Sequence, residues 1–182
     1  MTDLADAPVP AQPVLGDSST WGPEQQRTIH WHEPHGVAAV GLTLSGLDYL
    51  HAMADGRLPL PPIARLLDMR PVSATEGEVV FECTPDHSGY NPLGFVHGGV
   101  MCTLLDTAGG CAVHTTLPAG VGYTSIEIKV SYLRGVHAGV PLRAVGRVTK
   151  PGRRVAFAEA EILDPDGKLV ASATTSCLII GG

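Results

Sequence analysis

Charged residues are scarce in this sequence and a long apolar run is missing; each shortage excludes a class of protein. Charged residues make up 16% of the 182 residues and hydrophobic residues 44%, which does not fit a disordered tail or a coiled coil. No apolar run approaches the ~20 residues that a helix needs to span a bilayer. The net charge of −6 provides no broad basic surface, so we expect neither nucleic acid nor a membrane as a partner.

The four cysteines form no CxxC pair and no dense pattern. Their scatter argues against a zinc knuckle and a disulfide framework, and it favours a reducing compartment. The N-terminal residues are acidic and contain prolines, and they lack the basic and apolar regions of a signal peptide. We therefore expect a cytoplasmic protein of about one domain in length.

The first third of the chain is predicted to precede the main domain. Residues 1–28 contain prolines without apolar periodicity and indicate a flexible arm. Residues 29–62 form a helical extension, with one short helix over 46–54. A proline-rich link follows, and a second short helix over 63–67 opens the main domain, residues 63–182.

The main domain contains one long helix followed by strands. Apolar residues keep helical spacing from His97 to Leu117, and Pro118 ends the run. Alternation, β-rich composition and tight turns predict strands over residues 78–84, 123–133, 142–150, 154–163 and 168–180. A single twisted antiparallel sheet curled round the helix accounts for this order, which is an α+β fold.

One carboxylate stands out on the long helix. Asp106 is the only Asp, Glu, Lys or Arg between Asp86 and Glu127, and its neighbours along the helix are apolar. A carboxylate in such surroundings is unfavourable unless it is paired, hydrogen-bonded or protonated. One interpretation is an ordinary helix aspartate that bonds a backbone group or faces an interface. The other is a base or nucleophile, because active sites tolerate such groups.

The same helix opens with His97-Gly98-Gly99. Glycines there let a ligand approach unpaired backbone N–H groups, and the helix dipole favours negative charge, as in an oxyanion hole. The alternative is an ordinary helix start with glycines chosen for close packing. Gly98 and Asp106 lie about 12 Å apart along a helix that rises ~1.5 Å per residue, too far to meet one carbonyl. A site built from them is expected to be shared by two subunits.

Three segments together resemble the PaaI-type hotdog thioesterases: NPLGFVHGGVMCTLLDTAGG, YTSIEIKVSYLRG and PGRRVAFAEAEILDPDGKLVASATTS. The resemblance covers about residues 63–180. It implies a hotdog fold, in which an antiparallel sheet wraps round a long central helix. It also implies a homodimer with a continuous sheet, often paired again into a homotetramer. The implied activity is acyl-CoA hydrolysis, with CoA as part of the substrate and no separate cofactor.

The resemblance implies a role for each matching residue. Asp106 looks like the carboxylate that activates water, or attacks directly, from the opposing subunit. Gly98 looks like the glycine whose backbone N–H polarises the thioester carbonyl, with Gly99 beside it. Asn91 matches a loop asparagine that holds the carbonyl or the attacking water. His97 matches a histidine that shapes the loop.

One further position is carried over from the resemblance, and two arginines are candidates because of their chemistry. Ser125 matches a serine or threonine that positions the nucleophile, and Thr124 beside it leaves the register open by one residue. Arg153 and Arg154 follow a Pro-Gly turn. They either grip a CoA phosphate, which the forked guanidinium suits, or lie in a solvated turn.

Other residues carry weaker patterns. Three histidines and one glutamate lie within residues 30–35, but Pro34 breaks their spacing, so a surface segment is favoured and no metal is expected. His114 is interpreted as a core or interface histidine. Cys102 and Cys111 lack the base motif that a thiolate nucleophile needs.

The sequence therefore predicts an enzyme that hydrolyses an acyl-CoA to the free acid and CoA. Two alternatives stay open: a hotdog hydratase or dehydratase for hydroxyacyl thioesters, and an acyl-CoA-binding module without turnover. The acyl group is expected to be aromatic or of short or medium length, and the sequence does not distinguish among these. The extension before residue 63 is open to three interpretations, as a cap over the acyl tunnel, an oligomer contact or an inert arm.

Overall fold

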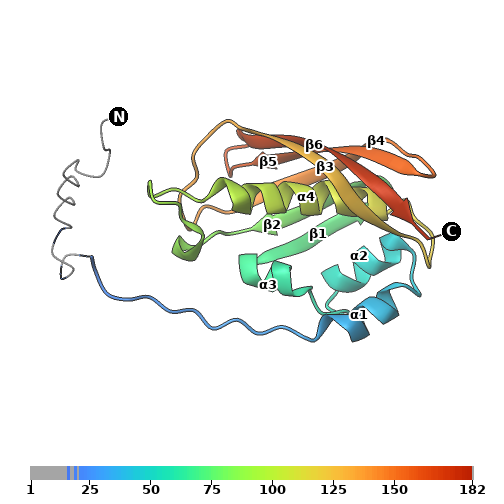
Figure 1. Cartoon of the computed structure of the whole chain (residues 1–182), viewed down its shortest axis with the longest axis horizontal. Coiled ribbons are helices and arrows are strands. Elements are labelled where there is room, and N and C mark those ends of the chain that lie inside the picture. Colours follow the sequence, from blue (N-terminus) through green and yellow to red (C-terminus); the bar gives the residue numbers. More distant parts are fainter. Residues whose placement is uncertain (1–15, 17–18, 20, 182) are drawn as a thin grey trace, which may run out of the picture.

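A six-stranded antiparallel sheet forms the frame of the molecule (Figure 1), and its strand order is β1-β2-β4-β5-β6-β3. The computed structural model describes residues 16, 19 and 21–181. The strands are β1 (Met69–Thr75), β2 (Glu78–Cys83), β3 (Gly122–Tyr132), β4 (Leu142–Lys150), β5 (Val155–Leu163) and β6 (Leu169–Ile180). The tight turn between β5 and β6 is closed by Asp164, whose side chain accepts hydrogen bonds from the backbone of residues 166 and 168.

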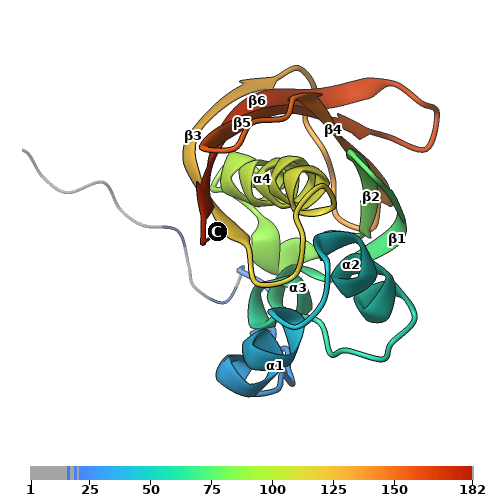
Figure 2. The same ribbon diagram turned by 90° about the vertical axis from the view of Figure 1, so that its right-hand side faces the viewer.

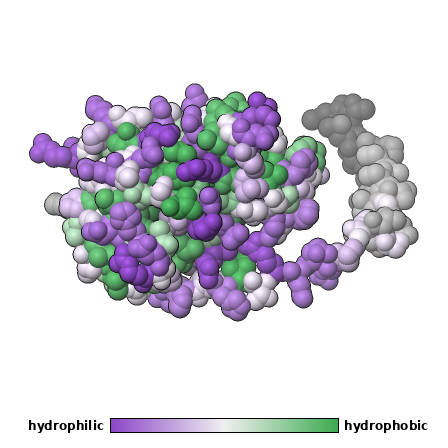
Figure 3. Space-filling model, turned by 180° about the vertical axis from the view of Figure 1, so that it is seen from behind, coloured by the Kyte–Doolittle hydropathy of each residue, from purple (hydrophilic) through white to green (hydrophobic). Residues whose placement is uncertain are grey.

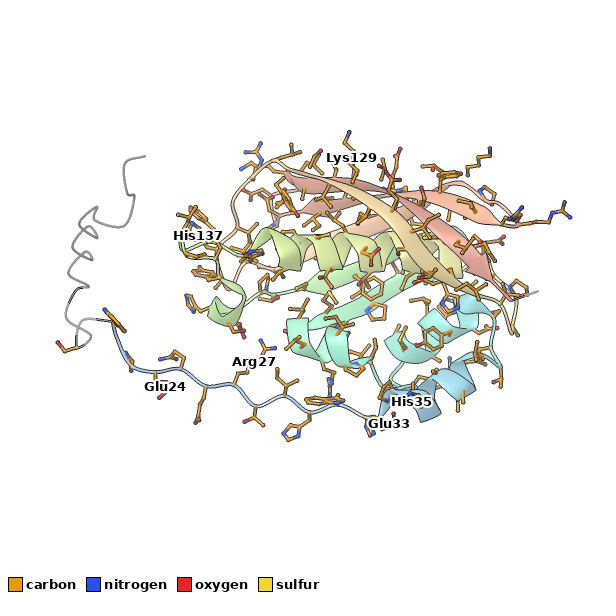
Figure 4. All side chains as sticks on the ribbon, in the orientation of Figure 1. Glu24, Arg27, Glu33, His35, Lys129 and His137 are labelled. Carbon is orange, nitrogen blue, oxygen red and sulfur yellow. The ribbon has the colours of Figure 1, made fainter. Side chains whose placement is uncertain are left out.

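The long helix α4 (Gly98–His114) lies on the concave side of the sheet, which curls round it (Figure 2). Leu104, Leu105, Ala108 and Ala112 are fully buried against the strands. Each leucine buried in this way contributes about 1.5–3 kcal/mol of transfer free energy. The outer face of the sheet is polar, and Lys129 points away from α4 there (Figure 4). The predicted α+β architecture is thus confirmed.

Three short helices cover the open side of the sheet, opposite its convex face (Figures 1 and 2): α1 (Pro34–Gly41), α2 (Gly46–Ala54) and α3 (Pro62–Leu67). The hydroxyl of Ser45 caps α2 by accepting from the Asp48 N–H at 3.1 Å. Leu50 of α2 is fully buried, and it belongs to the same hydrophobic core as α4. The core therefore continues from the main domain into the helical extension.

Most elements predicted from the sequence are confirmed, and three were missed. The helices predicted over 46–54 and 63–67 are α2 and α3, the long helix is α4, and the five predicted strands are β2 to β6. The missed elements are the helix α1, the strand β1 and the short 3-10 helix η3 (His87–Gly89). Pro34 stands at the first turn of α1, where a missing N–H does no harm, and Pro71 lies in β1, which is an edge strand. Each proline argues against a helix or a strand when the sequence pattern alone is used, so neither α1 nor β1 was predicted.

The segment before α1 runs extended along the underside of the molecule (Figure 1). Arg27 reaches from it toward the loop after β2 (Figure 4), where it pairs with Asp86 and also bonds the Leu66 carbonyl. Most of the arm predicted over residues 1–28 falls outside the described residues. The boundaries predicted at residues 28 and 62 stay predictions.

Seen from behind, apolar side chains reach the surface in patches separated by polar ones (Figure 3), as is usual for a folded chain. Among the residues that the structure describes, no helix combines the length and the apolar character that a membrane crossing requires.

Candidate active site

Asp106 lies on α4 next to the edge strand β3, and it is half-buried rather than enclosed in the core. Its Oδ1 accepts a hydrogen bond of 2.7 Å from the hydroxyl of Ser125 on β3. The sequence predicted apolar surroundings for this carboxylate. Only its neighbours along the chain are apolar residues of the core. Those neighbours, Leu104 and Leu105, turn into the core, and Asp106 does not follow them.

A β-bulge determines which hydroxyl of β3 forms the hydrogen bond with Asp106. The pairing of β3 with β6 shifts between Ser125 and Glu127, so Ile126 is the extra residue. Regular alternation from Ile128 would turn Thr124 toward the helix and Ser125 outward. Because the bulge reverses the alternation, Ser125 faces α4, and Thr124 does not make this hydrogen bond. The register that the sequence left open is thereby resolved in favour of Ser125.

A cavity of about 570 Å³ opens beside this pair, within the range of small-molecule sites. Asp106, Thr107, Cys111 and His114 line it along one side of α4. The opposite wall comes from the three N-terminal helices and their connections, so the extension forms part of this cavity. Of the described residues that line the cavity, Asp106 is the only Asp, Glu, Lys or Arg. The arrangement suits an apolar group whose reactive end meets one carboxylate.

The start of α4 keeps one backbone donor available. His97 caps the helix, and its Nδ1 accepts the Gly99 N–H at 2.8 Å, so this nitrogen carries no proton here. The Val100 N–H bonds the His97 carbonyl. Among the described residues the Gly98 N–H has no acceptor, and it is the donor left for a ligand. His97 therefore shapes the helix start, as expected, and Gly99 is occupied by its cap.

Gly98 is also held from the other side. The Tyr132 hydroxyl donates to the Gly98 carbonyl at 3.0 Å, and a Cβ on Gly98 would lie 3.1 Å from the tyrosine ring. Nearby, the Asn91 side-chain oxygen accepts from the backbone N–H groups of Leu93 and Phe95. These two hydrogen bonds fix the loop before α4.

The start of α4 and Asp106 line different cavities of one chain, and Gly98 and Asn91 themselves are in neither lining. A second cavity of about 570 Å³ is lined by His97, Gly99, Val100 and Thr103, and Asp106 is not part of it. Conversely, His97, Gly98 and Asn91 are absent from the lining of the Asp106 cavity. Within α4, Gly98 and Asp106 are separated by about 12 Å. The chain places the carboxylate and the backbone donor apart, as the sequence argument expected.

Several other candidates lie away from this site. Arg153 and Arg154 are exposed in the β4–β5 turn and line neither cavity. Glu33 contacts His35 at the surface (Figure 4), and in the described part of the chain no three potential ligands gather to hold a metal. Burial raises the pKa of the Cys111 thiol to about 12, which opposes a thiolate nucleophile.

Comparison with known proteins agrees with this geometry. The family model described as the thioesterase superfamily matches residues 93–171. A Caenorhabditis elegans protein named as an esterase is 37% identical over 105 residues, which are 57% of this chain and 62% of that protein, less than two thirds of its length. Human acyl-coenzyme A thioesterase 13 is 29% identical over 101 residues, which are 55% of this chain and 71% of the human protein.

A solved structure extends the comparison to the whole fold. The E. coli PaaI protein from the phenylacetic acid degradation operon is similar with a TM-score of 0.67 at 26% identity, over 78% of this chain and 97% of PaaI. An antiparallel sheet wrapped round one long central helix is the hotdog fold. The chain belongs to the thioesterase superfamily, as a PaaI-type hotdog member.

Proposed function

We propose that the protein hydrolyses the thioester of an acyl-CoA with an apolar acyl group, releasing the free acid and CoA. The observation that carries the proposal is the Asp106 carboxylate, held by Ser125 at the wall of an apolar cavity. The similarity to human acyl-coenzyme A thioesterase 13 supports CoA as the thiol. The described residues of the lining include no Lys or Arg that would pair a second carboxylate on the acyl group, which favours an uncharged acyl group.

The reaction needs an activated water and a place for negative charge. Asp106 takes a proton from water, and the oxygen attacks the thioester carbonyl carbon, or the carboxylate attacks it directly and water releases the acyl group afterwards. Either route places negative charge on the carbonyl oxygen. A backbone N–H directed at that oxygen stabilises it. The C–S bond then breaks, and CoA leaves as the thiolate and takes up a proton.

The backbone donor in this proposal is Gly98 of a second copy of the chain. Gly98 lies about 12 Å from Asp106 along α4 and is not among the residues that line the Asp106 cavity, so a partner must bring its helix start to that cavity. The outer edge of β3 supports such pairing. This strand is 11 residues long and has one neighbour, β6, and its Ile126 is 55% exposed. Long unpaired edges of this kind are templates for pairing with another strand.

The proposed activity is tested by release of free thiol from aromatic, short and medium acyl-CoAs. We expect turnover, and the binding constant of each acyl-CoA is measured in parallel by calorimetry. Binding of acyl-CoAs without thiol release would replace the proposal with a binding module. Release of water from a 3-hydroxyacyl-CoA without thiol release would replace it with a dehydratase.

Removing the hydroxyl that holds Asp106 is expected to lower activity moderately. Ser125→Ala removes one hydrogen bond to a charged group, a contribution of about 1.5–3 kcal/mol, so kcat falls by about 10- to 100-fold. Ser125 is one small residue of the cavity lining and the apolar walls are kept, so KM stays within about threefold. Steady-state kinetics measure both constants. Ser125→Thr keeps a hydroxyl and is expected to retain most of kcat. Equal losses of kcat in both variants would show that the Ser125 hydroxyl does not position Asp106.

A shared site predicts that two inactive variants restore each other. Asp106→Asn damages one half of the site and Gly98→Pro, which removes the Gly98 N–H, damages the other half. After subunit exchange half of the dimers are mixed, and each mixed dimer has one intact site out of two. Thiol release should therefore recover to about a quarter of the wild-type rate. The control is each variant mixed with itself. Subunit exchange is monitored by a tag that changes the size of one of the two chains. No recovery despite exchange would place both halves in one chain.

A further inference from the structure

The cavity beside Asp106 has a defined far end. Its lining residues on α4 run from Asp106 through Thr107 and Cys111 to His114, all on one side of the helix. Eight residues separate the two ends, which corresponds to about 12 Å along the helix axis. An acyl group whose carbonyl carbon is placed at Asp106 therefore extends along α4 toward His114.

Three rings from three separate elements meet at this far end. His114 lies between Tyr49 of α2 and Tyr123 of β3, and all three residues line the cavity. The ring centroids of Tyr49 and His114 are 5.3 Å apart, and those of His114 and Tyr123 are 5.5 Å apart. Tilted aromatic pairs at these separations are favourable. We name Tyr49, His114 and Tyr123 the ring wall.

Each ring of the wall is seated on a glycine. A Cβ on Gly41 would lie 2.6 Å from the Tyr49 ring, and a Cβ on Gly110 would lie 2.7 Å from the Tyr123 ring. At Gly46 a Cβ would come within 1.7 Å of the His114 carbonyl oxygen and 2.7 Å of its ring. The rings thus occupy the space that a side chain at each of these glycines would need. Because they pack closely against the backbone there, the ring wall cannot move easily to admit a longer ligand.

The ring wall carries no charge at neutral pH. Burial lowers the pKa of His114 and raises the pKa of Tyr123 well above its usual value, and burial also raises the pKa of Tyr49. The other lining groups of the far half are apolar, from α1, α2 and α3. An uncharged, rigid end favours an apolar terminus on the ligand and opposes a carboxylate or an ammonium.

We infer that the ring wall sets the maximum length of the acyl group, and that Tyr49, supplied by the N-terminal extension, is its specificity-determining residue. The inference rests on the proposed hydrolysis of acyl-CoA. Tyr49 stands between His114 and Gly41, so its ring fills the space between α4 and α1 at the far end of the cavity. The substrates accepted are apolar acyl-CoAs whose acyl group ends within about 12 Å of the carbonyl carbon. The extension is thus the end wall of the acyl tunnel.

The test compares hexanoyl-CoA with dodecanoyl-CoA. With C–C bonds of about 1.5 Å, an extended hexanoyl chain is shorter than the cavity and an extended dodecanoyl chain is longer. Wild type is expected to prefer hexanoyl-CoA. In Tyr49→Ala the ratio of kcat/KM for dodecanoyl-CoA to that for hexanoyl-CoA should rise by about tenfold or more, since each methylene in an apolar pocket changes this constant by about tenfold. The ratio is independent of how much of the sample is folded.

Two control variants separate ring bulk from other effects. Tyr49→Phe keeps the ring and removes the hydroxyl, and its ratio should equal that of wild type. Val40→Ala changes an exposed residue of α1 that does not line the cavity, and it should also leave the ratio unchanged. An unchanged ratio in Tyr49→Ala would overturn the inference, and so would an equal rise in Val40→Ala.

Failure of the proposed hydrolysis is distinguished by a second measurement. Binding of the same two acyl-CoAs is measured by calorimetry in Asp106→Asn and in Asp106→Asn combined with Tyr49→Ala. If wild type releases no thiol, the proposed function fails. The binding ratio still decides the inference: a rise of about tenfold in favour of dodecanoyl-CoA supports it, and no rise overturns it.

Discussion

Asp106→Asn is expected to reduce kcat for thioester hydrolysis by about 10²–10⁴-fold, with KM nearly unchanged. Asparagine has the size of aspartate, and its side-chain oxygen can still accept the Ser125 hydroxyl, so the local geometry is kept. What is lost is the ability to take a proton from water or to attack the carbonyl. The loss therefore falls on the chemical step, and free-thiol release under saturating acyl-CoA measures it.

The matched control for this variant is Glu159→Gln, which neutralises an exposed carboxylate on β5, outside the Asp106 cavity. It removes the same charge from the protein and should retain wild-type kcat. Wild-type turnover by Asp106→Asn would show that the carboxylate takes no part in the reaction, and the proposed mechanism would be wrong.

Gly98→Pro is expected to lower kcat by about 10²–10³-fold, the usual loss when one oxyanion donor is removed. Gly98 is the first residue of α4, where proline is well tolerated because the N–H has no helical acceptor. The preceding His97 has φ −62° and ψ 139°, which is the conformation that a following proline requires. The substitution therefore deletes the N–H donor and keeps the helix start.

Gly98→Ala is the control that isolates the donor. Both substitutions add a Cβ, which would lie 3.1 Å from the Tyr132 ring, so both press on the same neighbour. Alanine keeps the N–H, and its kcat should stay within about tenfold of wild type. Thermal unfolding checks that both variants fold. Equal losses in the two variants would assign the effect to Tyr132 displacement rather than to the backbone donor.

Much of the fold follows from local patterns in the sequence. The long helix and the strands β3 to β6 are marked by apolar periodicity and by turns such as that at residues 164–167, and these are local signals. The missed strand β1 contains Pro71, and its hydrogen bonds come only from its partner β2. The missed helix α1 has two glycines in eight residues, and its formation depends on packing against Tyr49. Neither contact can be predicted from the residues next to it in the sequence.

The site was only partly predictable for the same reason. Asp106 and the glycines before it stand out because of their composition and spacing, and the shared-site argument needed only the helix rise. The choice between Thr124 and Ser125 depends on a bulge that the strand pattern does not reveal. The ring wall joins residues 49, 114 and 123, which meet only through tertiary packing. His114 was interpreted from sequence as a core or interface residue, and it lines the cavity instead.

The bulge at Ile126 also bears on how this strand tolerates insertions and deletions. Loss or gain of one residue in a strand ordinarily turns every following side chain to the wrong face. Here the two residues before the bulge, Thr124 and Ser125, both carry a hydroxyl. If one residue were gained between the bulge and Ile128, the alternation would shift by one position, and the hydroxyl of Thr124 would turn toward Asp106 in place of that of Ser125. The strand thus holds a spare partner for the carboxylate, one position away.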